Sequence, residues 1–286
     1  MPDALLFCQD AELILKVEAL AKSQSFRLKS ISDLELAKGW LRLRKFDLAL
    51  IPSSLEVKEQ EQLATLLWER NPMGRFLIVG WDPDDSQAPA ARLFGAEVVC
   101  GPDALARLQK IFETFKPAAG DDDKPHHILV VEDLESPREI ICILIESLGY
   151  RHVLGVNSGA AALAELRNAP DKYACVVADI KMPHMNGAEL IQAMREDTGL
   201  SRIPVVVLTA YGTVDWLVEC LHAGASGFLL KPPKKKDMRR ELARAMRVFS
   251  HGLDPRLVKE QDAVTLRRIL EAVSYTHLTL PTIYSV

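Results

Sequence analysis

Cysteine, long apolar runs and an excess of charge of one sign are all scarce in this chain of 286 residues. The five cysteines are odd in number and far apart, and no two of them form a CxxC pair. This argues against a disulfide framework or a zinc site and favours small buried side chains in a reducing compartment, so we expect a cytoplasmic protein. The cysteines are Cys8, Cys100, Cys142, Cys175 and Cys220.

The scarcity of apolar runs and of net charge excludes further classes. No apolar run approaches the ~18 residues that a membrane-spanning helix needs, and the first residues lack the basic and long apolar segments of a signal peptide. We therefore expect no membrane contact. The formal net charge of −4 gives no reason to expect nucleic-acid binding through bulk electrostatics. Nucleic acid would be a partner only if an output domain outside this sequence bound it.

What is present is an internal repeat. Hydrophobic residues make up 48% of the chain and charged residues 26%, values typical of globular proteins, and the length suits two domains. Segments of the first half match segments of the second at an offset of about 125 residues. The matched pairs are Leu5–Asp10 with Ile128–Asp133, Phe46–Pro52 with Tyr173–Asp179, Phe76–Val79 with Pro204–Val207, and Phe94–Val99 with Ala223–Phe228.

The repeat predicts the domain organisation. Residues 1–116 form a first domain, residues 117–126 a linker rich in proline, glycine and acidic residues, and residues 127–250 a second domain. Gly252 and Pro255 then break the chain, and residues 251–272 form a helical extension. This extension either leads to an output domain or packs back on the second domain.

The last residues, 273–286, show neither helical nor strand periodicity. They resemble the translation of a transposon-adapter end used in library preparation, with Ile283–Val286 as barcode. We therefore leave them out of the fold prediction. On this interpretation the natural chain continues beyond Ala272.

Each copy alternates short apolar runs with longer amphipathic stretches. In the second copy we predict strands at residues 128–132, 152–156, 174–178, 204–208 and 227–230, and helices at 137–148, 158–167, 187–195, 213–222 and 234–249. Ser136 and Ser158 are predicted N-caps, with Pro137 at the first helical position. Such a pattern indicates a parallel sheet covered on both faces. The expected fold class is α/β, with two flavodoxin-like, doubly wound (βα)5 domains whose parallel five-stranded sheets have the order 2-1-3-4-5.

Reactive side chains follow four of the predicted strands in the second copy. Because the carboxyl ends of parallel strands share one edge of the sheet, three carboxylates should meet there with a hydroxyl and an ammonium. Like charges would raise one another's pKa, and a divalent cation removes this cost; an all-oxygen set suits Mg²⁺. Such a ring fits phosphoryl transfer to a carboxylate. The residues are Glu132 and Asp133 at the end of the first strand, Asp179 at the end of the third, Thr209 at the end of the fourth and Lys231 at the end of the fifth.

Residues 126–248 resemble a response-regulator receiver domain. The resemblance rests on the acid pair, on Asp179 with the turn Met182-Pro183-x-Met185-Asn186-Gly187, on Thr209-Ala210 and on Lys231-Pro232, in this order and spacing. It implies that Asp179 is the phosphoacceptor and takes its phosphoryl group from the phosphohistidine of a histidine kinase or phosphotransfer protein. It also implies a switch that catalyses only its own phosphorylation and dephosphorylation, rather than a metabolic enzyme.

The same resemblance implies roles for the neighbouring residues. Asp133, Asp179 and the backbone carbonyl of Lys181 would ligate Mg²⁺, with Glu132 acting through water. Lys231 would contact the phosphoryl group through its ammonium, and its peptide bond to Pro232 would be cis. Thr209 and Phe228 would form the switch that responds to phosphorylation.

Taken singly, each of these residues has a plainer interpretation. Asp179 could cap a helix, Thr209 could be an ordinary β-branched strand residue, and Phe228 could belong to the core. Lys231 could begin the solvated run Lys234–Lys236. Because these residues occur together, in order, at the ends of the predicted strands, we favour a phosphoryl-transfer site over the separate plainer interpretations.

Three alternatives differ in what they require. A phosphatase with an aspartate nucleophile would need a second aspartate two residues after Asp179, where Lys181 stands. A dinucleotide enzyme would need a glycine-rich turn where the acidic segment Glu132–Glu135 stands. A silent tandem receiver scaffold, acting only through protein–protein interaction, is an alternative that only a phosphorylation measurement excludes.

The first copy resembles the same family without its chemistry. Pro52 stands at the phosphoacceptor position, and proline has no nucleophile. Gln9 replaces the first acid, whereas Asp10 remains. We predict a pseudo-receiver that mediates homodimerisation, docks a partner, packs on the second copy or acts as a spacer. The remaining replacements are Gly80 or Trp81 near the threonine position and Gly101 at the lysine position.

Overall fold

The computed structural model describes residues 1–80, 91, 95–115, 127–210 and 214–257. The chain forms two compact units, Met1–Ala119 and Gly120–Val286. The predicted linker 117–126, the helical extension from residue 258 onward and the tail 273–286 lie outside the described residues. In the parts of the chain that the structure describes, no helix has the length and apolar character needed to cross a bilayer.

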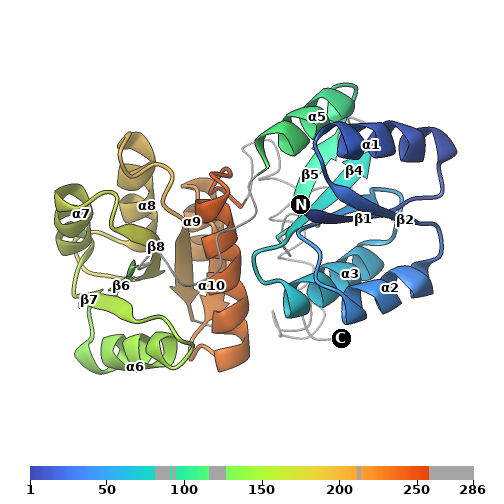
Figure 1. The fold of residues 1–286 in the computed structure, drawn as a ribbon. Helices are drawn as coiled ribbons and strands as arrows, with labels where there is room; N and C mark the ends of the chain where they lie inside the picture. The colour runs from blue at the N-terminus through green and yellow to red at the C-terminus, as the bar shows by residue number, and fades with distance from the viewer. Residues whose placement is uncertain (81–90, 92–94, 116–126, 211–213, 258–286) are drawn as a thin grey trace. The chain divides into compact units, whose positions relative to one another are not determined.

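The first unit contains a five-stranded parallel sheet in the order β2-β1-β3-β4-β5. In Figure 1, helices α1 and α5 lie on one face of this sheet, and α2 and α3 lie on the other. The strands are β1 (Asp3–Phe7), β2 (Arg27–Ile31), β3 (Leu48–Pro52), β4 (Arg75–Gly80) and β5 (Glu97–Cys100). The described helices are α1 (Ala11–Ser23), α2 (Leu34–Leu43), α3 (Val57–Arg70) and α5 (Ala104–Thr114).

The second unit repeats this architecture, with the sheet order β10-β9-β8-β6-β7. Counted within the unit, this is again the order 2-1-3-4-5, so the predicted fold class is confirmed for both units. The strands are β6 (His127–Val131), β7 (His152–Val156), β8 (Tyr173–Asp179), β9 (Val205–Thr209) and β10 (Gly227–Leu230). The helices are α6 (Glu135–Glu146), α7 (Gly159–Asn168), α8 (Gly187–Glu196), α9 (Val214–His222) and α10 (Lys235–Ser250).

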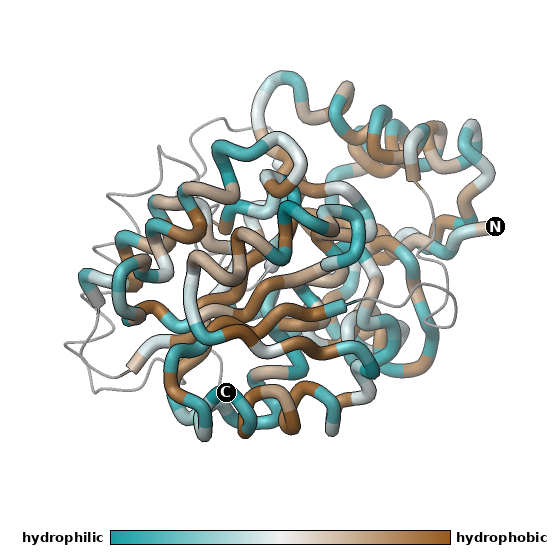
Figure 2. Tube along the Cα trace, turned by 90° about the vertical axis from the view of Figure 1, so that its left-hand side faces the viewer, coloured by the Kyte–Doolittle hydropathy of each residue, from teal (hydrophilic) through white to brown (hydrophobic). Residues whose placement is uncertain are grey.

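In each unit, helices cover both faces of the sheet, so the central strands are buried and form the hydrophobic core. Every residue of β8 is buried, including Asp179 at its end. Figure 2 shows apolar residues concentrated along the strands, beneath helices whose outer surfaces are more polar. Continuous apolar strands are the sequence signature of a parallel sheet, and this is why their positions could be predicted to within two residues.

Two predicted helix starts had different outcomes. The Ser158 hydroxyl accepts a hydrogen bond from the Ala161 N–H and caps α7, as predicted. The prediction for α6 was wrong, because this helix starts at Glu135 and Leu134 occupies the N-cap position without a side-chain bond. Pro137 is tolerated at the third helical position because the first N–H groups of a helix have no intrahelical partner. The predicted start of α9 at residue 213 lies outside the described residues.

Candidate functional site

Three carboxylates meet at the carboxyl ends of β6 and β8. Glu132 and Asp133 follow β6, and Asp179 is the last residue of the neighbouring strand β8. One oxygen from each carboxylate lies within 4.8 Å of the others. Glu132 is 1% exposed and Asp179 is 8% exposed, so both charges are largely removed from water. Buried carboxylates require a cation or hydrogen bonds to remain ionised.

Lys231 supplies a cation to this cluster from the end of β10. Its Nζ lies 2.6 Å from Glu132 Oε2 and 2.9 Å from Asp179 Oδ2. Burial raises the pKa of Glu132, and the hydrogen bond from Lys231 opposes this rise. Burial also opposes the charge of Lys231, but hydrogen bonds to Glu132 and Asp179 leave its pKa above the ordinary value. The ammonium therefore stays charged between the two carboxylates.

The backbone around Lys231 fixes the direction of its side chain. The Lys231 N–H donates to the Thr209 carbonyl at 2.7 Å, which continues the β9–β10 ladder by one residue. The Lys231–Pro232 peptide bond is cis, as the resemblance implied.

The other sequence-predicted residues lie around the same edge of the sheet. Thr209 ends β9, the strand that pairs with β8, and is 3% exposed. Phe228 lies on β10 and is partly buried. Lys181 is exposed two residues after Asp179, and its Nζ lies 5.6 Å from the centre of the Trp216 ring.

The turn after β8 holds Asp179 at the edge of the sheet. The Gly187 N–H donates to the Ile180 carbonyl at 2.8 Å. A Cβ atom at Gly187 would lie 2.7 Å from the Asp179 carbonyl oxygen, so a larger residue would push the turn away. Asn186 and Glu189 form a reciprocal capping box that starts α8. This explains why the sequence has Asn-Gly at this point.

One residue that contacts the acid pair was not predicted from the sequence. Arg138, on α6, donates from Nη1 to the Glu132 carbonyl at 2.9 Å and to the Asp133 carbonyl at 3.4 Å. It therefore holds the backbone of the acid pair in place. Main-chain acceptors have no sequence signature, so the pattern around Arg138 could not have revealed this contact.

The strand register shows which residues of the first unit occupy the equivalent positions. Ser53 N–H bonds to the Val79 carbonyl just as Ile180 N–H bonds to the Leu208 carbonyl, so Pro52 corresponds to Asp179. Gly101 N–H bonds to the Gly80 carbonyl at 3.1 Å, as Lys231 does to Thr209. Gly80 therefore corresponds to Thr209, and Gly101 to Lys231. Trp81, the other sequence candidate, lies outside the described residues.

The register corrects the prediction for Asp10. Cys8 N–H bonds to the Ile31 carbonyl as Glu132 N–H bonds to the Val156 carbonyl, so Cys8 and Gln9 replace Glu132 and Asp133. Asp10 is one residue further along and accepts from the Glu12 and Leu13 N–H groups as the N-cap of α1. The sequence alignment was shifted by one residue because it matched Asp10 with Asp133 by residue type, whereas the strand pairing aligns Asp10 with Leu134. No acid of the pair therefore remains in the first unit.

Comparison with known proteins identifies the second unit. The family model described as response regulator receiver domain matches residues 128–243. A two-component response regulator of Oryza sativa subsp. indica, ORR11, is 34% identical over 122 residues, which are 43% of this chain and 82% of the relative. The chain belongs to the response regulator receiver domain family.

Further receiver proteins match the same part of the chain. The response regulator ORR5 of Oryza sativa subsp. japonica is 35% identical over 121 residues, 42% of this chain and 89% of the relative. Among solved structures, the receiver domain of a sensor histidine kinase from Pseudomonas aeruginosa PAO1 is 31% identical and has a TM-score of 0.38. The match covers 42% of this chain and 97% of that domain, which has a magnesium ion coordinated in its active-site cleft.

Proposed function

We propose that residues 127–250 act as a phosphoacceptor receiver domain of a two-component system, with Asp179 as the residue that becomes phosphorylated. The observation that carries this proposal is the position of Lys231, whose ammonium lies between Asp179 and Glu132 at 2.9 Å and 2.6 Å. A lysine ammonium that already contacts a nearly buried carboxylate is in position to neutralise the negative charge of a phosphoryl group attached to that carboxylate.

The proposed reaction moves a phosphoryl group from nitrogen to oxygen. An Asp179 Oδ atom forms a bond to phosphorus as the phosphorus–nitrogen bond of a phosphohistidine breaks. The electron pair of that bond stays on the imidazole, which takes up a proton from solvent. Lys231 neutralises phosphoryl oxygens, and the Thr209 hydroxyl donates a hydrogen bond to one of them. The donor is a histidine kinase or a phosphotransfer protein, and the domain catalyses only its own phosphorylation and dephosphorylation.

The residues at the site fit a magnesium ion. Glu132 Oε1 is buried and has no hydrogen-bond partner among the residues that the structure describes. The three carboxylates provide only oxygen atoms, which Mg²⁺ prefers. We propose that Glu132, Asp133, Asp179 and the Lys181 carbonyl hold the ion, directly or through water. When bound, it would neutralise charge on the phosphoryl oxygens.

The first unit has the receiver fold without a phosphoacceptor, so we propose that it is a pseudo-receiver. All five positions of the site have changed, and none of the replacements combines a nucleophile with a neighbouring cation. The replacements are Cys8, Gln9, Pro52, Gly80 and Gly101. In this proposal, phosphorylation at Asp179 changes the conformation around Thr209 and Phe228 and relays the signal.

Intact mass spectrometry tests the proposal. The full chain would be incubated with acetyl phosphate and Mg²⁺, whose reaction releases acetate as the phosphorus–oxygen bond breaks. One added phosphoryl group is expected in the wild type, and none in Asp179→Ala or after addition of a chelator. An unmodified wild-type mass, with Mg²⁺ binding shown by calorimetry, would instead support a silent scaffold of tandem receivers.

A further inference from the structure

Helix α2 of the first unit carries an exposed apolar stripe. Leu36 is 62% exposed and Leu43 is 82% exposed, and Gly39 and the partly exposed Trp40 lie between them. These residues are at positions i, i+3, i+4 and i+7, so they lie on one side of the helix. The opposite side carries Ala37 and Leu41, both 0% exposed, which pack against the rest of the unit. Core packing therefore does not account for the exposed Leu36 and Leu43, and Trp40 between them is only partly buried, with Lys29 Nζ 4.9 Å from the centre of its ring.

The second unit shows that the receiver fold does not require this stripe. Helix α7 is the counterpart of α2, and each is capped at its start by a side chain, Asp33 in α2 and Ser158 in α7. Counting from these caps, the four stripe positions correspond to small or polar residues in α7. They are Ala161, Ala164, Glu165 and Asn168.

The spacing of the stripe is self-complementary. If two copies of α2 meet in antiparallel orientation about the midpoint between Gly39 and Trp40, Leu36 of one faces Leu43 of the other. Each Trp40 then faces Gly39 of the second copy. A Cβ atom placed on Gly39 would have no atom within 4 Å, so there is open space for a partner's indole. Burying such leucine and tryptophan side chains is favourable, because it removes apolar surface from water.

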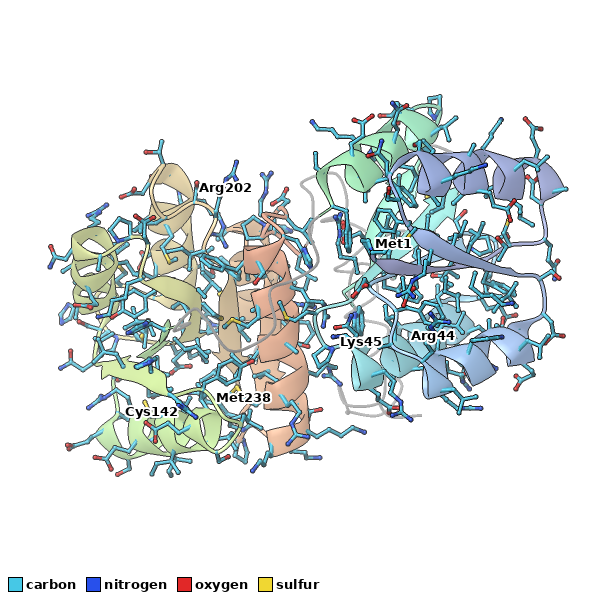
Figure 3. All side chains as sticks on the ribbon, viewed as in Figure 1. Met1, Arg44, Lys45, Cys142, Arg202 and Met238 are labelled. Atoms are coloured by element: carbon cyan, nitrogen blue, oxygen red, sulfur yellow. The ribbon has the colours of Figure 1, made fainter. Side chains whose placement is uncertain are left out.

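The charges beside the stripe favour the antiparallel orientation. Glu35 and Arg42 lie on the same flank, near opposite ends of the helix. A two-fold axis perpendicular to the helices brings equal flanks together, so Glu35 of one copy lies near Arg42 of the other, twice. The Glu35 side chain is 74% exposed, although it also pairs with Lys38 of its own helix at 2.7 Å. Arg44, labelled in Figure 3, instead pairs with Asp3 at 3.3 Å.

We propose that α2 of the first unit is the contact surface of a homodimer, formed by two antiparallel copies of α2 through Leu36, Gly39, Trp40 and Leu43. This assigns an interaction role to the unit that has lost the phosphoryl site. The proposal does not depend on phosphorylation at Asp179. We expect a weak dimer that forms only at high protein concentration, because one helix face per copy is a small contact beside the ~800 Å² per partner of stable interfaces.

Analytical ultracentrifugation of the full chain from about 5 to 200 µM tests this contact. The average mass should rise from 31.8 kDa toward twice that value with increasing concentration. Leu43→Glu should weaken dimerisation by about tenfold or more, since it places a charge against the apolar Leu36 of the second copy. Leu15→Glu is the matched control, because Leu15 is 68% exposed but lies on α1, on the other face of the sheet. It should leave dimerisation unchanged.

A charge exchange tests the orientation. Glu35→Arg and Arg42→Glu should each weaken the dimer, and the double variant should restore it, with circular dichroism confirming that all three are folded. Asp179→Ala should dimerise like the wild type. A wild type that stays monomeric at 200 µM, or a dimer equally sensitive to the Leu15 and Leu43 substitutions, overturns the proposal. So does a double variant that remains folded but monomeric.

Discussion

Lys231 and Glu132 lie 99 residues apart in the sequence, yet Lys231 Nζ and Glu132 Oε2 are only 2.6 Å apart. The two residues follow the fifth and the first strands of the second unit, and their contact spans the two strands between them, β9 and the strand β8 that ends in Asp179. The lysine side chain is 25% exposed, whereas that of Glu132 is 1% exposed. The contact therefore brings a cation from the rim of the site to a carboxylate at its base.

Replacing this lysine should separate metal binding from phosphorylation. We expect Lys231→Met to reduce the rate of phosphorylation by acetyl phosphate about 100-fold or more, because a preorganised charge at the phosphoryl oxygens is lost. Mg²⁺ affinity should be equal or higher, because a cation that repels the metal has been removed. Calorimetry and intact mass measure the two effects. A variant that is phosphorylated at the wild-type rate would show that Lys231 is structural only.

Magnesium should stabilise the second unit against heat. A ligand that binds only the folded state at 100 times its Kd contributes about 2.7 kcal/mol, which is a rise of several degrees in Tm. Differential scanning calorimetry with and without Mg²⁺ should show this rise in the wild type but not in Asp179→Asn. Glu146→Gln, which changes an exposed acidic residue at the end of α6, should keep it. A rise retained in Asp179→Asn would place the ion elsewhere.

A single substitution should not restore the first unit. We expect Pro52→Asp, made in the Asp179→Ala background, to give no phosphoryl adduct. The positions equivalent to Glu132, Asp133 and Lys231 hold Cys8, Gln9 and Gly101, so none of these positions offers the new residue a second carboxylate or an ammonium. Intact mass after acetyl phosphate treatment is the measurement. A stoichiometric adduct at residue 52 would contradict the assignment of this unit as a pseudo-receiver.

Two buried thiols should make stability fall at high pH. Burial raises the pKa of Cys175 and of Cys220 to about 12. The unfolded thiols ionise near pH 8.5, so between about pH 8.5 and 12 the unfolded state binds fewer protons and stability decreases with pH. Urea unfolding at pH 8 and 10 should show a smaller loss in the Cys175→Ala/Cys220→Ala variant than in the wild type. Equal losses would mean that neither thiol contributes.

Arg195 should be important for stability although it is remote from the carboxylates. Its guanidinium donates to the carbonyls of Ser201, Ile203 and Gly224 at 2.9 to 3.1 Å. Arg195→Met leaves these carbonyls without this donor, and we expect a loss of about 2 to 3 kcal/mol in unfolding free energy. Arg202→Met is the control, since Arg202 is exposed (Figure 3) and should change stability by less than about 0.5 kcal/mol. Urea denaturation measures both variants.

The sequence was sufficient to predict the fold because each strand is a short, continuous apolar run between amphipathic segments. It was also sufficient to place Glu132, Asp179, Thr209 and Lys231 at one edge, because parallel strands end on the same side of a sheet. The start of α6 was missed because Ser-Pro is compatible with two positions in the first turn. The register error at Asp10 arose because an acidic residue was matched with an acidic residue, whereas Asp10 is the N-cap of α1.

Side-chain contacts to main-chain carbonyl groups could not be predicted from the sequence. Arg138 and Arg195 both act on carbonyl groups, which every residue possesses, so no residue type at the receiving end marks the contact. The stripe on α2 was present in the sequence, but its exposure could be judged only once the helix had been placed on the sheet.

The hydrogen bond from residue 231 to residue 209 has a counterpart from residue 101 to residue 80, although none of the four side chains is shared. Both bonds join N–H and carbonyl groups alone. At this edge, backbone atoms therefore determine the fold, whereas side-chain atoms determine the chemistry. A receiver can therefore lose the reactive side chains of its site and still form the backbone hydrogen bond that holds its fifth strand against its fourth. Its outer surfaces then remain available for another role.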